Sequence, residues 1–466
     1  MLKPVSVQDM AAAREARAAK QIALLERYRV PLISFTMNIA GPFKDSSLIR
    51  RGFLLGLRQL RRSLMAAGMT VTHMESFRAV TGSEALLCVD AEAGSVKKLT
   101  CEIEDADALG RLFDLDVITP DGGKIDRTSV GLTPRACLLC GNPATICARS
   151  RAHTVQALQR RTQEILQSAL EEADAEDIAQ AACRALLTEA CVTPKPGLVD
   201  CENSGSHRDM DLFSFMNSAS ALRPYMKRCA EAGLRTAASP ADQTFRQLQR
   251  FGRQAEGVML EATGGVNTHK GAIFALGIVC GALGRLSRSA WADASVVLAE
   301  CAALAKGLSA RAFAGITIEN ARTHGERLYA LYGLTGARGQ AEEGFPTVLF
   351  HGFPALKKAL AERKSLNDAG RAALLSMLAA DMDTNMVFRG GLETAQAAVL
   401  KIQALLEKTP YPSRDEISRL NDYFVERNLS PGGAADLLSV CFLLHFISSV
   451  ADEEWWAKEA AFVFTC

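Results

Sequence analysis

The sequence lacks the common signatures of nucleotide binding and of serine hydrolysis. It contains neither a Walker A loop nor a Gly-x-Gly-x-x-Gly fingerprint, and it has no Gly-x-Ser-x-Gly nucleophile elbow. It also lacks an excess of either charge, because 53 basic and 52 acidic residues leave a net charge of +1. This balance argues against a general nucleic-acid or membrane-surface protein, whereas a local phosphate-binding pocket is compatible with it.

Long apolar runs and targeting signals are missing as well. The uncharged stretches 271–284 and 437–450 are shorter than the roughly 20 residues that a membrane-spanning helix needs, so both are predicted to be buried helices. The Ala-, Arg- and Lys-rich segment 1–25 contains Asp9 and Glu15, which transit peptides avoid. With no signal peptide recognised, the 13 scattered cysteines indicate thiols in a reducing cytoplasm. We therefore expect a cytoplasmic protein with no membrane partner.

A chain of 466 residues is long enough for more than one domain. Residues 1–25 are predicted to form a helical extension. Residues 26–170 mix helical and strand-like patterns and indicate an α+β domain, whereas almost every segment of 178–466 has a helical period and indicates a larger all-α domain. The acidic run 171–177 is interpreted as a linker or as the first turn of the second domain. The strand-like runs are 32–38, 70–77, 85–89, 97–103 and 112–117.

A pair of carboxylates is prominent in the first of these domains. Asp114 and Asp116 are two residues apart on a predicted strand and therefore point to the same side. Two such acids can share a divalent metal that bridges a polyphosphate, although many pairs of this kind merely decorate a strand. Basic residues near them are candidates to bind phosphate: Lys44, Arg50, Arg51 and Arg111.

Cysteines and a histidine cluster farther along the same domain. Cys137 and Cys140 form a Cys-x-x-Cys motif, and Cys147 and His153 follow it. The pattern suits a zinc site. The competing interpretation, favoured by the sequence alone, is that two cysteines of a turn pack in a core and that the other two residues are unrelated to them.

Five polar, glycine-containing segments interrupt the helical half, at 193–200, 203–211, 263–271, 336–346 and, as two late turns, 381–391 with 428–436. In the third, Asn267 or Thr268 can cap the helix that follows, so free N–H groups and Lys270 would form an anion site. The fourth is predicted to be a glycine-rich loop. Each segment alone is compatible with an ordinary turn. Five of them at the ends of apolar helices predict one convergent polar pocket.

The first half resembles a known enzyme family. Residues 34–42, 110–117, 135–141 and 147–153 are similar to the apo-citrate lyase phosphoribosyl-dephospho-CoA transferase family. The resemblance implies transfer of a phosphoribosyl-dephospho-CoA group to a serine of the citrate lyase acyl carrier protein, with release of pyrophosphate. It would then be Asp114 and Asp116 that hold Mg²⁺, while the four basic residues named above would neutralise the pyrophosphate.

The second half resembles triphosphoribosyl-dephospho-CoA synthase. Residues 194–200, 205–210, 265–271, 336–339, 383–391 and 430–436 carry this similarity. The resemblance implies that a ribose hydroxyl of 3′-dephospho-CoA displaces adenine from C1′ of ATP, with Mg²⁺ expected on the triphosphate. Candidates for proton transfer or carbocation stabilisation are Asp209, Glu256, His207, His269, Asp383 and Asp436. Candidates for phosphate binding are Lys195, Asn267, Thr268, Lys270, Arg338 and Arg389.

Together the two resemblances predict a fusion of two successive enzymes that make and attach the citrate lyase prosthetic group. Two alternatives stay open on the sequence. One is the equivalent enzyme pair serving malonate decarboxylase, and the other is a non-catalytic nucleotide-binding regulator. The expected partners are ATP, 3′-dephospho-CoA and the acyl carrier protein, and no nucleic acid.

Overall fold

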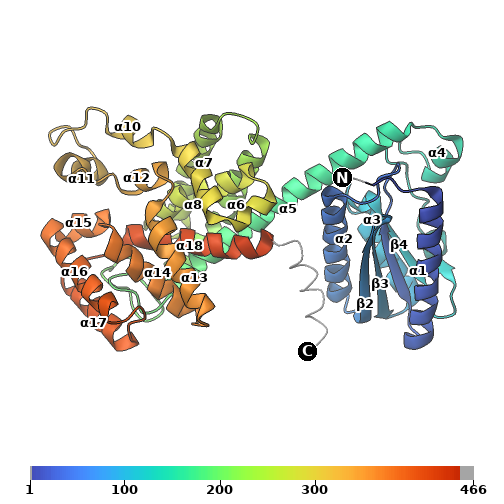
Figure 1. The fold of residues 1–466 in the computed structure, drawn as a ribbon, viewed down its shortest axis with the longest axis horizontal. Coiled ribbons are helices and arrows are strands. Elements are labelled where there is room, and N and C mark those ends of the chain that lie inside the picture. The colour runs from blue at the N-terminus through green and yellow to red at the C-terminus, as the bar shows by residue number, and fades with distance from the viewer. Residues whose placement is uncertain (1–2, 452–466) are drawn as a thin grey trace. The chain divides into compact units, whose positions relative to one another are not determined.

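The computed structural model describes residues 3–451, and the chain divides into two compact units, residues 1–171 and 172–466. Helix α5 (Val155–Cys191) contains the boundary, so the acidic run 171–177 is the middle of a continuous helix and not a linker (Figure 1). Within that run, Asp174 and Asp177 bind Arg288 at 2.5 and 2.9 Å. These carboxylates therefore stabilise the fold of the second unit.

The first unit is built on an antiparallel sheet with the strand order β2-β3-β1-β4-β5. The register places Ser34 of β1 opposite Asp116 of β4, and Thr36 opposite Asp114. These four polar side chains therefore share one face of the sheet. The strands are β1 (Leu32–Met37), β2 (Thr70–Ala79), β3 (Gly82–Asp90), β4 (Phe113–Ile118) and β5 (Lys124–Ile125).

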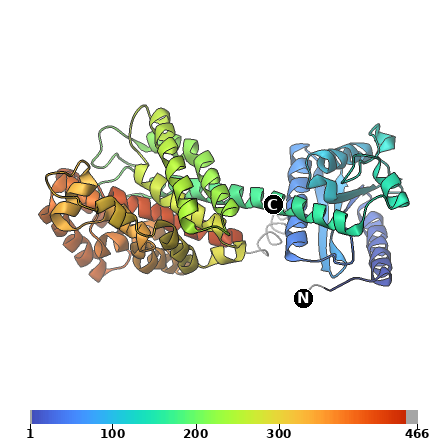
Figure 2. The same cartoon turned by 90° about the horizontal axis from the view of Figure 1, so that it is seen from above.

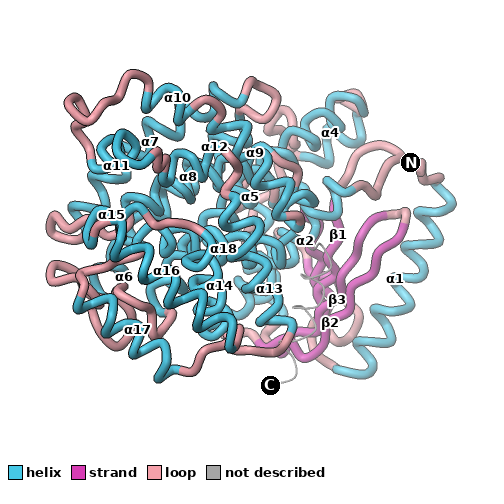
Figure 3. The backbone as a smooth tube through the Cα atoms, turned by 60° about the vertical axis from the view of Figure 1, so that its left-hand side comes forward, coloured by secondary structure: helices cyan, strands magenta, loops and turns pink. Residues whose placement is uncertain are grey.

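Helices cover both faces of this sheet (Figure 3). On the face of Ser34 and Asp116, helix α1 (Val7–Tyr28) packs Leu24 and Leu25 against apolar residues of β1 and β3. Segment 1–25 is therefore largely a layer of this unit and not an appendage. The opposite face packs against α2 (Ser47–Ala66), α3 (Ala93–Asp105) and the first turns of α5, and η1 (Gly110–Leu112), η2 (Thr128–Val130) and α4 (Ala144–Ser150) complete the unit.

Four of the five predicted strands are confirmed, as β1 to β4. The prediction for 97–103 is wrong, because this segment lies within α3. Leu99, Cys101 and Ile103 alternate as in a strand, which is why the sequence suggested one. In the structure, Glu92 caps the helix and the buried positions follow a helical period instead, at Val96, Lys97, Thr100, Cys101, Ile103 and Glu104.

The second unit is helical throughout its described part, as predicted (Figure 2). Helices α8 and α18 contact each other in its core, and α18 also packs against α14. Its elements after α5 are α6 (Leu212–Arg235), α7 (Ala241–Ala262), α8 (Lys270–Arg285), η3 (Arg288–Ala292), α9 (Ala294–Ala305), α10 (Leu308–Phe313), α11 (His324–Tyr332), α12 (Gly336–Glu342), η4 (Val348–Gly352), α13 (Phe353–Ala361), α14 (Leu366–Ala380), α15 (Thr384–Gly390), α16 (Leu392–Lys408), α17 (Arg414–Glu426) and α18 (Gly432–Ala451).

Among the described residues, α18 alone is long and apolar enough to cross a membrane by length and composition. Most of its apolar window, 61%, is buried inside the protein. Phe442 and Leu443 are fully buried in the same core as Val279 of α8. Burial against neighbouring helices thus accounts for its apolar character, and the predicted buried helices within 271–284 and 437–450 are confirmed.

Candidate functional site

All five predicted polar segments line one cavity of about 520 Å³ in the helical unit. The predicted convergence is therefore confirmed. Helix termini bring the segments together, since α8, α12, α15 and α18 all begin at or beside the wall. The polar wall residues include Glu189, Lys195, His207, Asn267, Thr268, His269, Lys270, Gln340, Asp381, Asp383, Asn385, Arg389, Ser430 and Asp436.

Two aspartates of this wall, the buried Asp383 and the half-buried Asp436, differ in their proton affinity. Asp383 accepts hydrogen bonds from the backbone N–H groups of Asn385, Met386 and Ala434, at 2.7, 3.1 and 2.8 Å. Burial raises the pKa of Asp383 to about 6, and the three N–H donors limit the rise. Burial, and then the negative charges of Glu189 and Asp383, raises the pKa of Asp436 well above its ordinary value. At neutral pH Asp383 is ionised, whereas the surroundings of Asp436 favour its protonated form, and such a difference is expected of a base and an acid.

Gly271 makes room for the Asp436 carboxylate. A Cβ atom built at Gly271 would collide with an oxygen of Asp436. The start of α8 and the first turn of α18 are thus in direct contact, and only glycine permits it at this position. The backbone N–H of Ala272, in the same turn of α8, binds the Asp436 carboxylate and opposes the rise of its pKa.

His269 is buried at the N-cap position of α8, where its side chain accepts no capping hydrogen bond. Its Nδ1 lies 2.7 Å from Ser218 Oγ, and Phe215 packs edge-on against the ring. Burial, followed by the charge of Lys195, lowers its pKa to about 3, so the imidazole is neutral. Its Nε2 and the Oγ1 of Thr268 are buried without a hydrogen-bond partner among the described residues. Two unsatisfied polar atoms in one cavity wall indicate a ligand that would satisfy them.

Asn267 takes part in the predicted capping of α8. Its Oδ1 accepts the N–H of Lys270 at 3.3 Å. Thr268 does not cap, because its hydroxyl is unpartnered.

His207 hydrogen-bonds Ser430, with Nε2 2.7 Å from Oγ. Burial, and then Arg389, lowers the pKa of His207. Asp209 lies 4.0 Å from Nδ1 of His207, too far for a hydrogen bond, and its side chain is 66% exposed. The three residues therefore do not form a hydrolytic triad in this structure.

Three predicted site residues are not among those that line the cavity: Asp209, Glu256 and Arg338. Glu256 pairs with Lys270 across α7 and α8 at 2.9 Å. Arg338 was expected on a glycine-rich loop. The segment begins as helix α12, whose geometry places Ala337 and Gln340 at the wall and the Arg338 guanidinium over the ring of Phe313.

The predicted cations take different positions. Lys270 lines the cavity and is mostly exposed, while Arg389 lines it and holds the 428 turn through a 3.0 Å bond to the carbonyl of Asn428. Lys195 also lines it but is buried, with Nζ 2.6 Å from Glu189 Oε1 and 2.7 Å from the Glu189 carbonyl.

Sequence reasoning missed Glu189 and left Asp381 without a role. Glu189 lies within helix α5. An acidic residue within a helix is ordinarily interpreted as exposed to solvent, so no sequence pattern indicated a role for Glu189. Asp381 accepts hydrogen bonds from Gln340 at 2.7 Å and from Thr347 at 3.0 Å, and all three line the cavity. The position of Asp381 just before residues 383–385, which carry the family resemblance, could have indicated that it belongs to the site.

A second polar cluster lies beneath α1 in the first unit. Asp114 and Asp116 are half-buried on the same face of β4, as predicted from their spacing. Lys124 binds Asp116 at 2.7 Å, and burial, followed by the charge of Asp116, raises the pKa of Asp114. Helix α1 contributes Gln21, which donates to Ser34 at 2.9 Å, and Arg17, which pairs with Glu84 at 2.9 Å and acts electrostatically on Asp114. No sequence pattern pointed to Arg17.

The basic residues predicted for phosphate binding in this unit interact with other groups of the protein. Lys44 donates to the carbonyl of Ile39, Arg50 pairs with Asp45 at 3.2 Å, and Arg111 pairs with Asp105 at 3.1 Å. Arg51 lies in the first turns of α2 beside Arg50.

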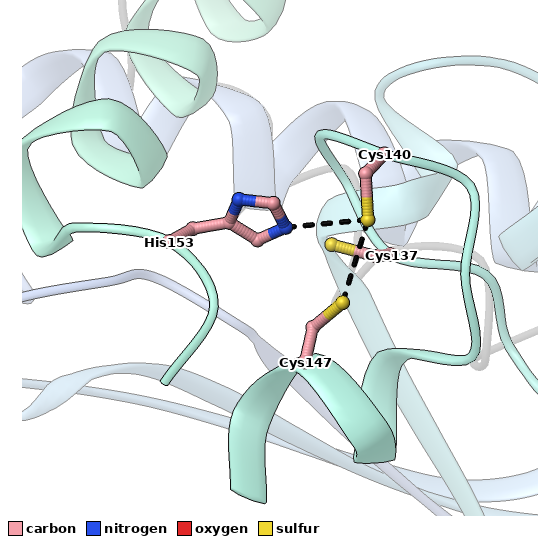
Figure 4. Close-up of side chains that lie close together, drawn as sticks. All are labelled: Cys137, Cys140, Cys147 and His153. Atoms are coloured by element: carbon pink, nitrogen blue, oxygen red, sulfur yellow. Dashed lines mark hydrogen bonds between the residues drawn. The ribbon is translucent and has the colours of Figure 1, made fainter. Parts of the chain in front are cut away.

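Cys137, Cys140, Cys147 and His153 come together, with their sulfur and nitrogen ligand atoms all within 4.8 Å of one another (Figure 4). The interpretation that two of the four are unrelated to the others is therefore wrong.

Comparison with known proteins agrees with this division of the chain. Residues 175–454 match the family described as ATP:dephospho-CoA triphosphoribosyl transferase, and residues 5–169 match apo-citrate lyase phosphoribosyl-dephospho-CoA transferase. Protein CitXG of Haemophilus influenzae is 35% identical over 459 residues, which cover 95% of this chain and 96% of that protein.

Shorter relatives match the helical unit. A probable 2-(5″-triphosphoribosyl)-3′-dephosphocoenzyme-A synthase of Photobacterium profundum is 42% identical over 269 residues, 56% of this chain and 84% of that protein. The synthase of Pectobacterium atrosepticum is 41% identical over 270 residues, 58% of this chain and 88% of that protein. The chain therefore belongs to the ATP:dephospho-CoA triphosphoribosyl transferase family through its helical unit, joined in one polypeptide to an apo-citrate lyase phosphoribosyl-dephospho-CoA transferase domain.

Proposed function

We propose that this bifunctional transferase makes and attaches the citrate lyase prosthetic group. The helical unit joins ATP to 3′-dephospho-CoA and releases adenine. The first unit then transfers phosphoribosyl-dephospho-CoA to a serine of the lyase acyl carrier protein and releases pyrophosphate. The observation that carries the proposal is the single cavity in which all five polar segments meet. Both family matches and the full-length relative support the citrate assignment over malonate decarboxylase.

Asp383 and Asp436 divide the proton transfers of the first reaction. The ribose hydroxyl of 3′-dephospho-CoA attacks C1′ of ATP as the bond from C1′ to adenine breaks. Asp383, ionised above about pH 6, takes the hydroxyl proton. Asp436, whose surroundings favour the protonated form, gives a proton to the departing adenine. The triphosphate stays intact, so its charge must be balanced by the wall of the cavity.

The start of α8 and Arg389 balance the negative charge of the triphosphate. Lys270 stands at the first position of α8, where the helix dipole favours an anion. The unsatisfied Thr268 Oγ1 and His269 Nε2 are close to the same helix start and would bind phosphate or ribose oxygens. Because His269 is neutral, its role is hydrogen bonding and not acid catalysis. Lys195 holds Glu189 in place and does not need to touch phosphate.

In the second reaction the carrier serine oxygen attacks the α-phosphorus of the triphosphoribosyl chain, and the bond to pyrophosphate breaks. Asp114 and Asp116 would hold the Mg²⁺ that neutralises charge on the phosphates. Lys124 and Arg17, whose charges act on Asp114, are further candidates to stabilise the leaving pyrophosphate. Substrates of this kind are cytoplasmic metabolites, and we place the enzyme in the cytoplasm.

A coupled assay tests the proposal. The full chain is incubated with Mg²⁺, ATP, 3′-dephospho-CoA and either the apo-carrier of citrate lyase or that of malonate decarboxylase. Intact-mass spectrometry should show the citrate lyase carrier gaining one phosphoribosyl-dephospho-CoA group. Labelling of the malonate decarboxylase carrier alone would support the alternative enzyme pair. Neither label nor adenine from folded protein would support a nucleotide-binding regulator.

A further inference from the structure

The segment between β4 and α5 has almost no hydrophobic core. From Ile118 to Arg161, Cys147 is the only buried residue in the described structure. Regular structure is confined to β5, the short η2 and α4, and a single bridge between Ala136 and Pro143. A segment of this length that buries so little apolar surface ordinarily needs a crosslink or a metal to hold one conformation. No disulfide lies among the described cysteines.

The ligand atoms of Cys137, Cys140, Cys147 and His153 gather where such a crosslink is needed (Figure 4). The sulfurs of Cys140 and Cys147 are 3.4 Å apart, and His153 Nε2 is 3.3 Å from Cys140 Sγ. Tetrahedral zinc, with Zn–S near 2.3 Å and Zn–N near 2.0 Å, places such pairs about 3.8 and 3.6 Å apart. A disulfide would require a separation of about 2.05 Å. The observed spacing is therefore close to that of zinc ligands.

The backbone around the ligands has the form of a folded turn. The N–H of Leu139 points at Cys137 Sγ at 3.5 Å, which favours a thiolate there. The N–H of Cys137 donates to the carbonyl of Asn142 at 2.6 Å, which closes the turn. Gly141, directly after Cys140, has a φ of +74°, a conformation that favours glycine. Cys147 comes from α4 and His153 from the residues after it, so the four ligands converge from separate pieces of backbone.

We propose that Cys137, Cys140, Cys147 and His153 bind one structural zinc ion that fixes this segment. Three cysteines and one histidine complete a tetrahedron, so the site has no open position for substrate. This inference concerns the stability of the first unit and is independent of the proposed reactions.

Hydrogen bonds join the segment with the four ligands to the start of the strand that carries Asp114 and Asp116. Arg135, two residues before the first ligand, donates to the carbonyls of Gly110 and Arg111 at 3.2 and 3.0 Å. Arg111 donates in return to the carbonyl of Ala136. These bonds tie the segment to η1, the entry to β4 with Asp114 and Asp116. Loss of zinc should therefore impair carrier labelling and spare adenine release.

Metal content and cobalt spectroscopy test the site directly. The full chain, purified without chelators, should contain one zinc per chain by elemental mass spectrometry. Apoprotein titrated with Co²⁺ should develop thiolate-to-cobalt charge-transfer bands that saturate at one equivalent and disappear when Zn²⁺ is added. The cobalt titration uses the unaltered chain, so it does not depend on a variant that folds.

Matched variants assign the ligands. Cys140→Ser and Cys147→Ser should lose at least tenfold in zinc affinity, measured by competition with a chromogenic chelator. His153→Cys should keep one zinc, because a fourth thiolate replaces the imidazole. Cys201→Ser, an exposed thiol in the other unit, is the control and should keep one zinc. A metal-free chain that gives no charge-transfer band, or one with a Cys140–Cys147 disulfide, would overturn the proposal.

Discussion

Lys195 and Glu189 form an ion pair of 2.6 Å with side chains only 2% and 4% exposed. The pair joins α5 to the loop 193–200, and the Lys195 ammonium also donates to the carbonyl of Glu189. The pair lies in the cavity wall, where it supports the fold and where the charge of Glu189 acts on Asp436.

Breaking this pair should destabilise the helical unit. Glu189→Gln leaves the Lys195 ammonium buried without its counter-ion, which costs about 3–5 kcal/mol. The measurement is chemical denaturation monitored by circular dichroism. The double variant Glu189→Gln with Lys195→Met removes both charges and should recover part of the loss. Equal stability of Glu189→Gln and the unaltered chain would show that the pair is not buried in solution.

Removing the space beside Asp436 should stop the first reaction. Gly271→Ala forces a methyl group against the Asp436 carboxylate at the start of α8. A displacement of this size in an active site lowers rates about 100-fold, and adenine release should fall accordingly. Gly257→Ala is the matched control, because a Cβ at this position in α7 meets no atom within 4 Å. Unchanged adenine release by Gly271→Ala would separate this contact from catalysis.

Adenine release should depend on pH through Asp383. Its carboxylate must be ionised to accept the hydroxyl proton, and its pKa is raised to about 6 by burial. The rate constant kcat/KM should therefore fall tenfold per pH unit below about pH 6 and level off above it. Steady-state kinetics between pH 5 and 8 gives the profile. Neutral His269, with a pKa of about 3, adds no further step in this range, so His269→Gln should lower the rate and leave the profile unchanged.

The aspartate pair of the first unit should be needed only for transfer. Asp114→Asn and Asp116→Asn each remove a proposed Mg²⁺ ligand, and carrier labelling should fall by more than 100-fold. Adenine release should continue, since it takes place in the other unit. Asp126→Asn, an exposed position in the same region, is the control. If labelling survives in both variants, the metal-pair assignment is wrong.

The sequence could predict features that depend on local pattern. Helix ends rich in glycine and small polar residues identified the segments of the cavity, because a chain that must cap helices and approach a ligand uses these residues. The spacing of Asp114 and Asp116 identified a shared face, because side chains two residues apart on a strand point to the same side.

Features set by tertiary packing were out of reach. Glu189 lies in a regular helix and acquires its role only because a loop brings Lys195 against it. Arg338 belongs to a glycine-containing motif, yet α12 places it over Phe313. The alternation at 97–103 suggested a strand. The segment is helical because Glu92 caps α3 and because the helix buries one of its faces. The approach of His153 to the three cysteines likewise depends on the path of the chain after α4.

The most direct test of the account is the stoichiometry of adenine. The full chain is mixed with ATP and 3′-dephospho-CoA, and free adenine and both substrates are measured by chromatography. We predict one adenine formed for each ATP and each 3′-dephospho-CoA consumed, with activity lost in Asp383→Asn and kept in Arg338→Ala. Folded protein that forms no adenine, or that forms adenine equally well without 3′-dephospho-CoA, would contradict it.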